Sequence, residues 1–147
     1  MQQGAPNPYL RTKILTASPQ ELRLMLYDGA IKFCRQAVDA LKQSQFESSY
    51  NGLMRAQKIV LELSTSLDHT VDPDLCGKLA ALYTYIYRLL VDANMSRTPD
   101  KIEEAITLLE YEKQTWQMLM KRIGEKGEAP PDAGAQQTAI SSLSTNA

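Results

Sequence analysis

Apolar side chains recur every three or four residues along most of the chain, and no stretch shows the strict alternation of a half-buried strand. This spacing predicts four helices, at about residues 19–42, 46–66, 73–94 and 99–123. The first has a strong start signal, because Ser18 can cap it, Pro19 suits its first position and Glu21 completes a capping box. Asp72-Pro73 and Thr98-Pro99 mark two later starts in the same way.

The helix lengths and short connections predict an all-α fold, an antiparallel four-helix bundle over residues 18–124. Before the bundle, residues 1–17 contain Pro6 and Pro8, and we expect them to form an extended N-terminal arm. After it, residues 125–147 have little apolar material and no periodicity, which predicts a disordered C-terminal tail.

Two of the helices are apolar over more of their circumference than a surface position requires. At about 100° per residue, the apolar positions of residues 19–42 and 73–94 each cover about 200°, against a minimum stripe of about 100°. One interpretation is that these helices are simply the most deeply buried. The other is that their extra strips form a groove that receives an apolar helix from a partner. Periodicity leaves both interpretations open.

The groove interpretation selects a set of large apolar and tyrosine side chains, because tyrosine tolerates a half-wet site and is common at interfaces. The expected partner-binding residues are Leu24, Tyr27, Ile31, Tyr50, Tyr83, Tyr87 and Val91. The arm also carries large apolar groups, each worth about 1.5–3 kcal/mol when buried. We therefore expect the arm, anchored by Tyr9 and Ile14, to cover part of the groove in the free protein.

Composition narrows the classes of function. The 147 residues include 16 Lys plus Arg and 17 Asp plus Glu, so the net charge is −1, which argues against a nucleic-acid binder with a broad cationic face. The longest nearly apolar run, residues 79–91, contains Arg88 and is too short to insert across a bilayer. No secretory signal is recognisable at the N-terminus, and we expect a cytoplasmic domain.

The inventory of reactive groups is thin. His69 is the single histidine and falls in a predicted turn, whereas a di-iron bundle needs two helical histidines and a phosphotransfer bundle needs one on a helix body. Cys34 and Cys76 lie on apolar strips, where cysteine usually acts as a small hydrophobe. No phosphate-binding glycine loop or nucleophile motif occurs. We therefore predict no enzyme activity, no cofactor and no metal site.

Specific strings add a family resemblance. Residues 16–33 (TASPQELRLMLYDGAIKF), 56–63 (AQKIVLEL) and 82–94 (LYTYIYRLLVDAN) are similar, in this order, to segments of the flagellar secretion chaperone family. The Asn-Pro-Tyr of residues 7–9 resembles the arm of that family, and Trp116 falls where its members commonly carry a tryptophan. The resemblance covers about residues 7–123.

The resemblance implies a cytoplasmic helical bundle that binds newly made flagellin through flagellin's C-terminal segment, which is disordered in the free monomer. Such a chaperone prevents premature polymerisation and helps deliver its cargo to the cytoplasmic domain of the flagellar type III export gate. It needs no nucleotide. The alternative is a helical-bundle signalling adaptor, including a histidine phosphotransfer module. The oligomeric state, monomer or homodimer, stays open.

Overall fold

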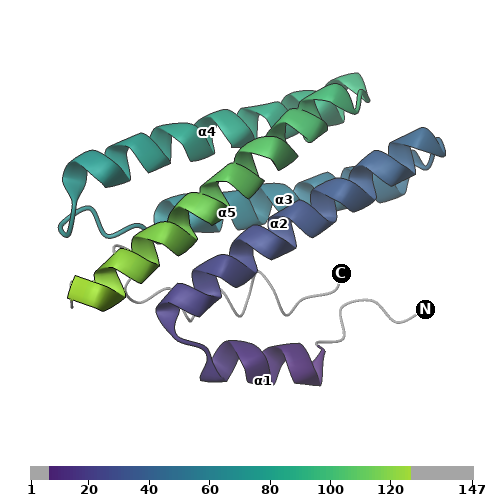
Figure 1. Cartoon of the computed structure of the whole chain (residues 1–147). Coiled ribbons are helices and arrows are strands. Elements are labelled where there is room, and N and C mark those ends of the chain that lie inside the picture. The colour runs from purple at the N-terminus through teal and green to yellow at the C-terminus, as the bar shows by residue number, and fades with distance from the viewer. Residues whose placement is uncertain (1–6, 127–147) are drawn as a thin grey trace.

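Five helices account for most of residues 7–126, the part of the chain that the computed structural model describes (Figure 1). They are α1 (Pro8–Thr16), α2 (Pro19–Lys42), α3 (Phe46–Thr65), α4 (Pro73–Ser96) and α5 (Asp100–Lys126). These residues include no strand, so the all-α class predicted from the sequence is confirmed for them. The four long helices begin within a residue or two of the predicted positions.

Local capping chemistry explains this agreement for α2 and α4. The Ser18 hydroxyl oxygen accepts a hydrogen bond from the backbone N–H of Glu21 at 3.2 Å, and Pro19 occupies the first position of α2. Asp72 caps α4 in the same way, through the backbone N–H of Leu75 at 3.1 Å. Each cap satisfies a backbone donor that has no partner within its own helix, so the sequence signal and the start of the helix coincide.

The predicted extended arm is wrong over Pro8–Thr16, which form α1. The Asn7 side chain accepts hydrogen bonds from the backbone N–H groups of Tyr9, at 3.0 Å, and Leu10, at 3.2 Å. Pro8 then stands in the first turn, where its missing N–H costs nothing and its fixed φ suits the helix. Residues 1–6 of the predicted arm lie outside the described residues.

The predicted end of the last helix is also wrong, because α5 continues through Gly124 to Lys126. A glycine weakens a helix by about 1 kcal/mol but does not stop it as a proline would, and the next proline is Pro130. Residues 125 and 126 of the predicted tail are therefore helical. The rest of the predicted tail, residues 127–147, lies outside the described residues.

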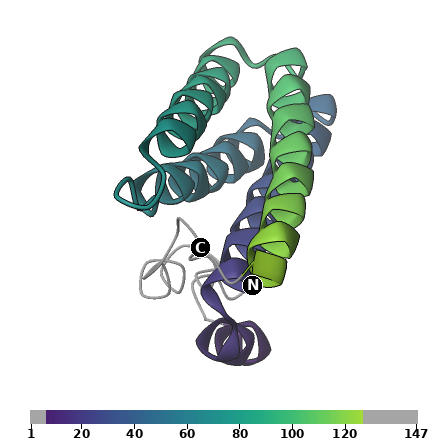
Figure 2. The ribbon, with the colours of Figure 1, turned by 60° about the vertical axis from the view of Figure 1, so that its left-hand side comes forward.

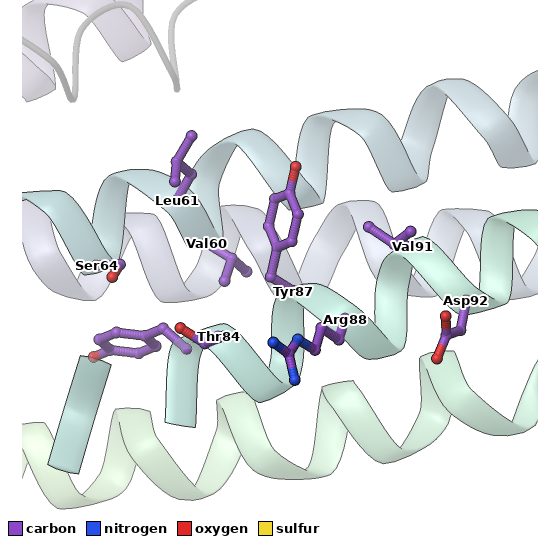
Figure 3. Close-up of a pocket in the computed structure, with 9 residues that line it drawn as sticks. Val60, Leu61, Ser64, Thr84, Tyr87, Arg88, Val91 and Asp92 are labelled. Carbon is purple, nitrogen blue, oxygen red and sulfur yellow. The ribbon is translucent and has the colours of Figure 1, made fainter. Parts of the chain in front are cut away.

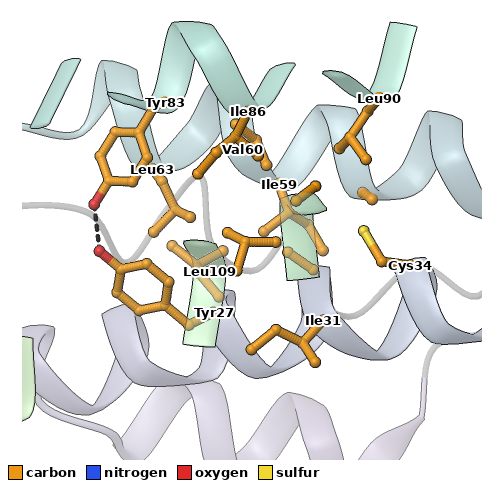
Figure 4. Packing of buried hydrophobic residues seen from close by; sticks show 14 of the residues in the cluster. Tyr27, Ile31, Cys34, Ile59, Val60, Leu63, Tyr83, Ile86, Leu90 and Leu109 are labelled. Atoms are coloured by element: carbon orange, nitrogen blue, oxygen red, sulfur yellow. Dashed lines mark hydrogen bonds between the residues drawn. The ribbon is translucent and has the colours of Figure 1, made fainter. Parts of the chain in front are cut away.

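The four long helices pack side by side, and the chain reverses direction at each connection between them (Figures 1 and 2). α2 packs against α3 and α5, and α4 packs against the same two helices. Each long helix contributes to one continuous apolar core, represented by Ile31, Ile59, Ile86 and Leu109 (Figure 4). Ile14 of α1 is fully buried and joins this core, and Leu10 of α1 is partly buried against it, so α1 is anchored to the long helices by these two side chains.

Gly52 marks a close approach between α2 and α3. A Cβ atom at this position would lie 3.2 Å from the backbone oxygen of Phe33 and 3.5 Å from the Cβ of Ala37. A backbone carbonyl within a helix cannot move aside as a flexible side chain does. Gly77 of α4 is different, because a Cβ atom added there would meet nothing within 4 Å.

These two glycines give a matched prediction. Gly77→Ala should stabilise the protein by about 0.5–1 kcal/mol, because alanine loses less backbone entropy in a helix. Gly52→Ala should destabilise it, because overpacking costs about 1–3 kcal/mol and exceeds the same entropic gain. Urea denaturation of both variants checks this. Equal stabilisation by the two substitutions would show that the α2–α3 contact is loose.

Candidate functional site

An apolar groove runs between α3 and α4 on the surface of the protein (Figure 3). It has a volume of about 380 Å³. α3 contributes three lining residues and α4 six, and together they are Val60, Leu61, Ser64, Tyr83, Thr84, Tyr87, Arg88, Val91 and Asp92. We call this hollow the α3–α4 groove.

The groove has a buried floor, and its apolar walls are exposed to water. Val60 and Tyr83 are buried and form its floor. Leu61 is 53% exposed and Tyr87 is 36% exposed, so both keep apolar surface in contact with water. Contiguous exposed apolar surface of this kind is typical of a site that binds another protein segment.

The apolar surface extends beyond the groove along α3. Phe46, Tyr50, Met54 and Leu61 are all exposed and fall within an arc of about 80° on the helical wheel. We call these four residues the α3 stripe; they span about 22 Å of helix. At its far end the guanidinium carbon of Arg97, the residue that follows α4, lies 4.3 Å from the centre of the Phe46 ring. An elongated partner, such as a helix, fits this shape.

Below the groove floor lies a buried polar cluster. Arg23 of α2 is fully buried, and one of its terminal nitrogens donates hydrogen bonds to the hydroxyl of Tyr83 and the backbone oxygen of Leu63, both at 2.9 Å. The hydroxyls of Tyr83 and Tyr27 are hydrogen-bonded to each other (Figure 4). The Arg23 guanidinium carbon also lies 4.7 Å from the centre of the Trp116 ring. Arg23, Tyr27, Tyr83, Glu112 and Trp116 are called the Arg23 cluster below.

Burial sets the protonation of this cluster. Loss of solvent raises the pKa of Tyr27 and of Tyr83 above the usual value, so both hydroxyls are neutral hydrogen-bonding groups at physiological pH. Burial likewise raises the pKa of Glu112, and the positive charge of Arg23 opposes that rise. The cluster is thus a structural polar centre rather than a set of ionised tyrosines.

The next features concern thiol reactivity, metal binding and membrane spanning. Burial raises the pKa of the Cys34 thiol to about 12, which leaves almost no thiolate at neutral pH. Within residues 7–126, no group of three or more His, Cys, Asp and Glu side chains is placed to hold a metal ion. Among the same residues, none of the helices has the length and apolar character needed to cross a bilayer.

The structure brings together only some of the residues expected at the groove. Tyr83, Tyr87 and Val91 line it, and Tyr50 belongs to the α3 stripe next to it. The predicted residues on α2 do not line it: Tyr27 and Ile31 are buried in the core and Leu24 is half-buried. Their expected contact with a partner stays a prediction.

The two predicted arm anchors differ from each other. Ile14 is fully buried, whereas Tyr9 is 77% exposed. α1 lies against α2, where Leu10 and Lys13 border a small hollow together with residues of α2 that include Phe33. Covering of the partner-binding surface by this arm stays a prediction.

Sequence reasoning missed the contribution of Phe46, Met54 and Leu61 on α3. It followed the breadth of the apolar arc, which singled out α2 and α4. A usable signal was present, because positions 46, 50, 54 and 61 are large and apolar, and the last three lie beside the core face of the same helix rather than within it.

An all-helical fold over residues 7–126 with an exposed apolar groove is typical of helical proteins that bind a segment of a partner. The family model of flagellar protein FliS matches residues 1–123. The chain therefore belongs to the FliS family, and the resemblance seen in its sequence strings is confirmed.

Several relatives agree with this assignment. The chain is 37% identical to the flagellar secretion chaperone FliS of Bacillus subtilis over 101 residues, which are 67% of this chain and 74% of the relative. It is 31% identical to the chaperone of the same name from Campylobacter jejuni over 112 residues, covering 76% and 88% of the two chains. The Salmonella typhimurium protein is 29% identical over 111 residues, covering 75% and 82%. These names describe chaperones, in agreement with the prediction that the chain is not an enzyme.

Glu112 should give the folding stability a distinctive pH dependence. Because burial raises its pKa in the folded state, the folded chain binds this proton more tightly than the unfolded chain does. That contribution favours folding below the unfolded pKa of about 4.3 and is lost as the pH rises through the folded pKa. In Glu112→Gln this loss is absent, so the variant should gain stability relative to the parent as the pH rises.

Denaturant midpoints of both proteins between about pH 4 and pH 8 measure this difference. The control is Glu103→Gln, a substitution at an exposed position in the first turn of α5. A stability difference between Glu112→Gln and the parent that stays constant over this range would contradict the prediction.

Proposed function

We propose that this chain is an export chaperone that binds newly made flagellin through flagellin's C-terminal segment, prevents premature polymerisation and helps deliver flagellin to the flagellar type III export gate. The four long helices act as an antiparallel four-helix bundle that carries the binding surface. The observation that carries the proposal is the wet apolar α3–α4 groove, continued by the α3 stripe, in a member of the FliS family.

The surface suits the chemistry of such a client. A segment that packs inside a filament is amphipathic, and in the free monomer its apolar face would drive self-association. The groove offers Leu61 and Tyr87 to that face, while Arg88 and Asp92 offer charge to its polar edge. The client becomes ordered only on binding, so the entropy of ordering subtracts from the affinity and helps release.

The arm forms a second part of the same device. α1 is held to the core by Ile14, and its Leu10 packs next to α2 while Tyr9 stays exposed. We propose that the arm covers part of the partner-binding surface in the free protein and that the client displaces it. The energy of docking the arm is then subtracted from that of binding the client.

The proposal gives the protein a location and two successive partners. It acts in the cytoplasm, where flagellin is synthesised, and binds flagellin first. The cargo-loaded form then meets the cytoplasmic domain of the export gate. The competing interpretation, a signalling adaptor or histidine phosphotransfer module, has less support, because His69 lies in the connection between α3 and α4 and not on a helix body.

Co-elution with flagellin tests the proposal directly. The purified chain is mixed with full-length flagellin of the same organism, or with flagellin lacking its C-terminal segment, and run on size-exclusion chromatography. We expect a complex with the full-length protein only. Absence of that complex, or an equal complex with truncated flagellin, would overturn the proposal.

Two substitutions locate the binding surface. Tyr87→Ala and Leu61→Ala each remove an exposed apolar side chain from the groove wall. Each should weaken flagellin binding by about 1–3 kcal/mol, or about five- to 150-fold in Kd. Because both side chains are partly exposed, the free energy of unfolding should change by only about 0.5–1 kcal/mol. Isothermal titration calorimetry and urea denaturation measure the two effects.

Tyr111→Ala is the matched control, because Tyr111 is a 64% exposed tyrosine on α5 that does not line the groove. Its Kd should equal that of the parent. If Tyr111→Ala weakened binding as strongly as Tyr87→Ala, the client surface would lie elsewhere.

A further inference from the structure

We propose that Arg23 is a positioning residue for the α3–α4 groove. Its hydrogen bonds join α3 to α4, and this joint holds the end of the groove near Tyr83 at a fixed width. The part of this inference that concerns client binding rests on the proposed function. The part that concerns the rigidity of the groove can be measured on the free protein.

The joint is made by a single guanidinium group. One terminal nitrogen of Arg23 has two hydrogens, and it donates to the backbone oxygen of Leu63 on α3 and to the hydroxyl of Tyr83 on α4, each at 2.9 Å. The other terminal nitrogen donates to the hydroxyl of Ser66 at 3.1 Å, directly after α3. If α3 and α4 moved apart here, a fully buried cation would lose at least one of these acceptors.

The atoms that Arg23 holds are next to the groove wall. Tyr83 is shared, since its ring lines the groove while its hydroxyl belongs to the Arg23 cluster. Ser64, another lining residue, directly follows Leu63 in the chain. Tyr87 lies one turn beyond Tyr83 on the same side of α4, and Figure 3 shows it beside Val60 of α3. A shift at the joint therefore changes the distance between the walls.

The guanidinium is itself held in place. Its central carbon lies 4.7 Å from the centre of the Trp116 ring of α5 and 5.6 Å from that of the Tyr83 ring. The hydroxyl of Tyr27 closes the cluster from α2 by its hydrogen bond to Tyr83. A planar, permanently charged group fits such a site, because its donors are fixed in one fork and its faces stack on aromatic rings.

Binding to a groove of fixed width loses less conformational entropy than binding to a groove that must first become ordered. Loss of the joint should therefore loosen the groove at its Tyr83 end and weaken client binding beyond what a general loss of stability would produce. This regional effect separates a positioning role from an ordinary core residue.

Two variants break the joint from opposite sides. Arg23→Met keeps the aliphatic stem and removes the donors, and Tyr83→Phe keeps the ring that lines the groove and removes the acceptor. Tyr27→Phe is the matched control for loss of a hydroxyl from the same cluster, since Tyr27 does not line the groove and Arg23 keeps its bond to Tyr83. Ile102→Val is the stability control, at a fully buried position on α5.

Native-state hydrogen exchange of the full chain, without client, is the first measurement. Arg23→Met and Tyr83→Phe should raise exchange about tenfold or more at the amides of residues 60–66 and 83–88, the scale expected for a lost hydrogen bond to a charged group. The two controls should change those amides by a smaller factor. A rise spread evenly over all four long helices, in proportion to the change in unfolding midpoint, would overturn the proposal.

Binding of a synthetic peptide with the sequence of flagellin's C-terminal segment is the second measurement. Tyr83→Phe should raise its Kd about tenfold, whereas Ile102→Val should leave it unchanged; equal Kd values for the two would overturn the proposal. If the parent does not bind the peptide, the proposed function fails and the exchange data still decide the role of Arg23. If Arg23→Met does not fold, Tyr83→Phe decides it alone.

Discussion

A buried arginine is the constraint on which the arrangement of the long helices depends. Removing a guanidinium from water costs several kcal/mol unless its donors are met and its charge is compensated. Arg23 is fully buried, and its acceptors come from the end of α3 and from α4, while α5 supplies the Trp116 ring that stacks on it. The helices must therefore converge at this one point, where α3 and α4 have little freedom to separate.

From that fixed point the same two helices carry the exposed apolar surface. A folded domain usually buries side chains such as Leu61 and Tyr87, because moving their apolar surface out of water stabilises the fold. Here they stay exposed to water along the α3–α4 groove, next to the buried Arg23 cluster. In the proposed function, this surface binds a client that becomes ordered on contact. The cost of ordering the client reduces the net binding free energy, so the client can still be released.

Local signals could be predicted from the sequence and long-range ones could not. Ser18, Pro19 and Asp72 act within one turn, so helix starts were predictable. The start of α1 is the exception: Asn7-Pro8 is a local cap-plus-proline signal of the same kind, and it was missed because Pro8 was taken to oppose a helix.

The site shows the same division. Apolar arcs selected Tyr83, Tyr87 and Val91, which line the groove, and also Tyr27 and Ile31, which are buried in the core. Which part of an apolar arc faces which helix depends on packing between helices that are distant in sequence. In the sequence, Arg23 resembles any surface charge, because its acceptors on α3 and α4 lie 40–60 residues away.

Site-specific photocrosslinking in the complex with flagellin tests the central claim most directly. The photoreactive residue p-benzoylphenylalanine replaces either Tyr87, in the α3–α4 groove, or Tyr111, on the exposed face of α5. The account predicts that position 87 crosslinks to the C-terminal segment of flagellin and that position 111 does not. A crosslink to that segment from position 111 with none from position 87 would contradict it.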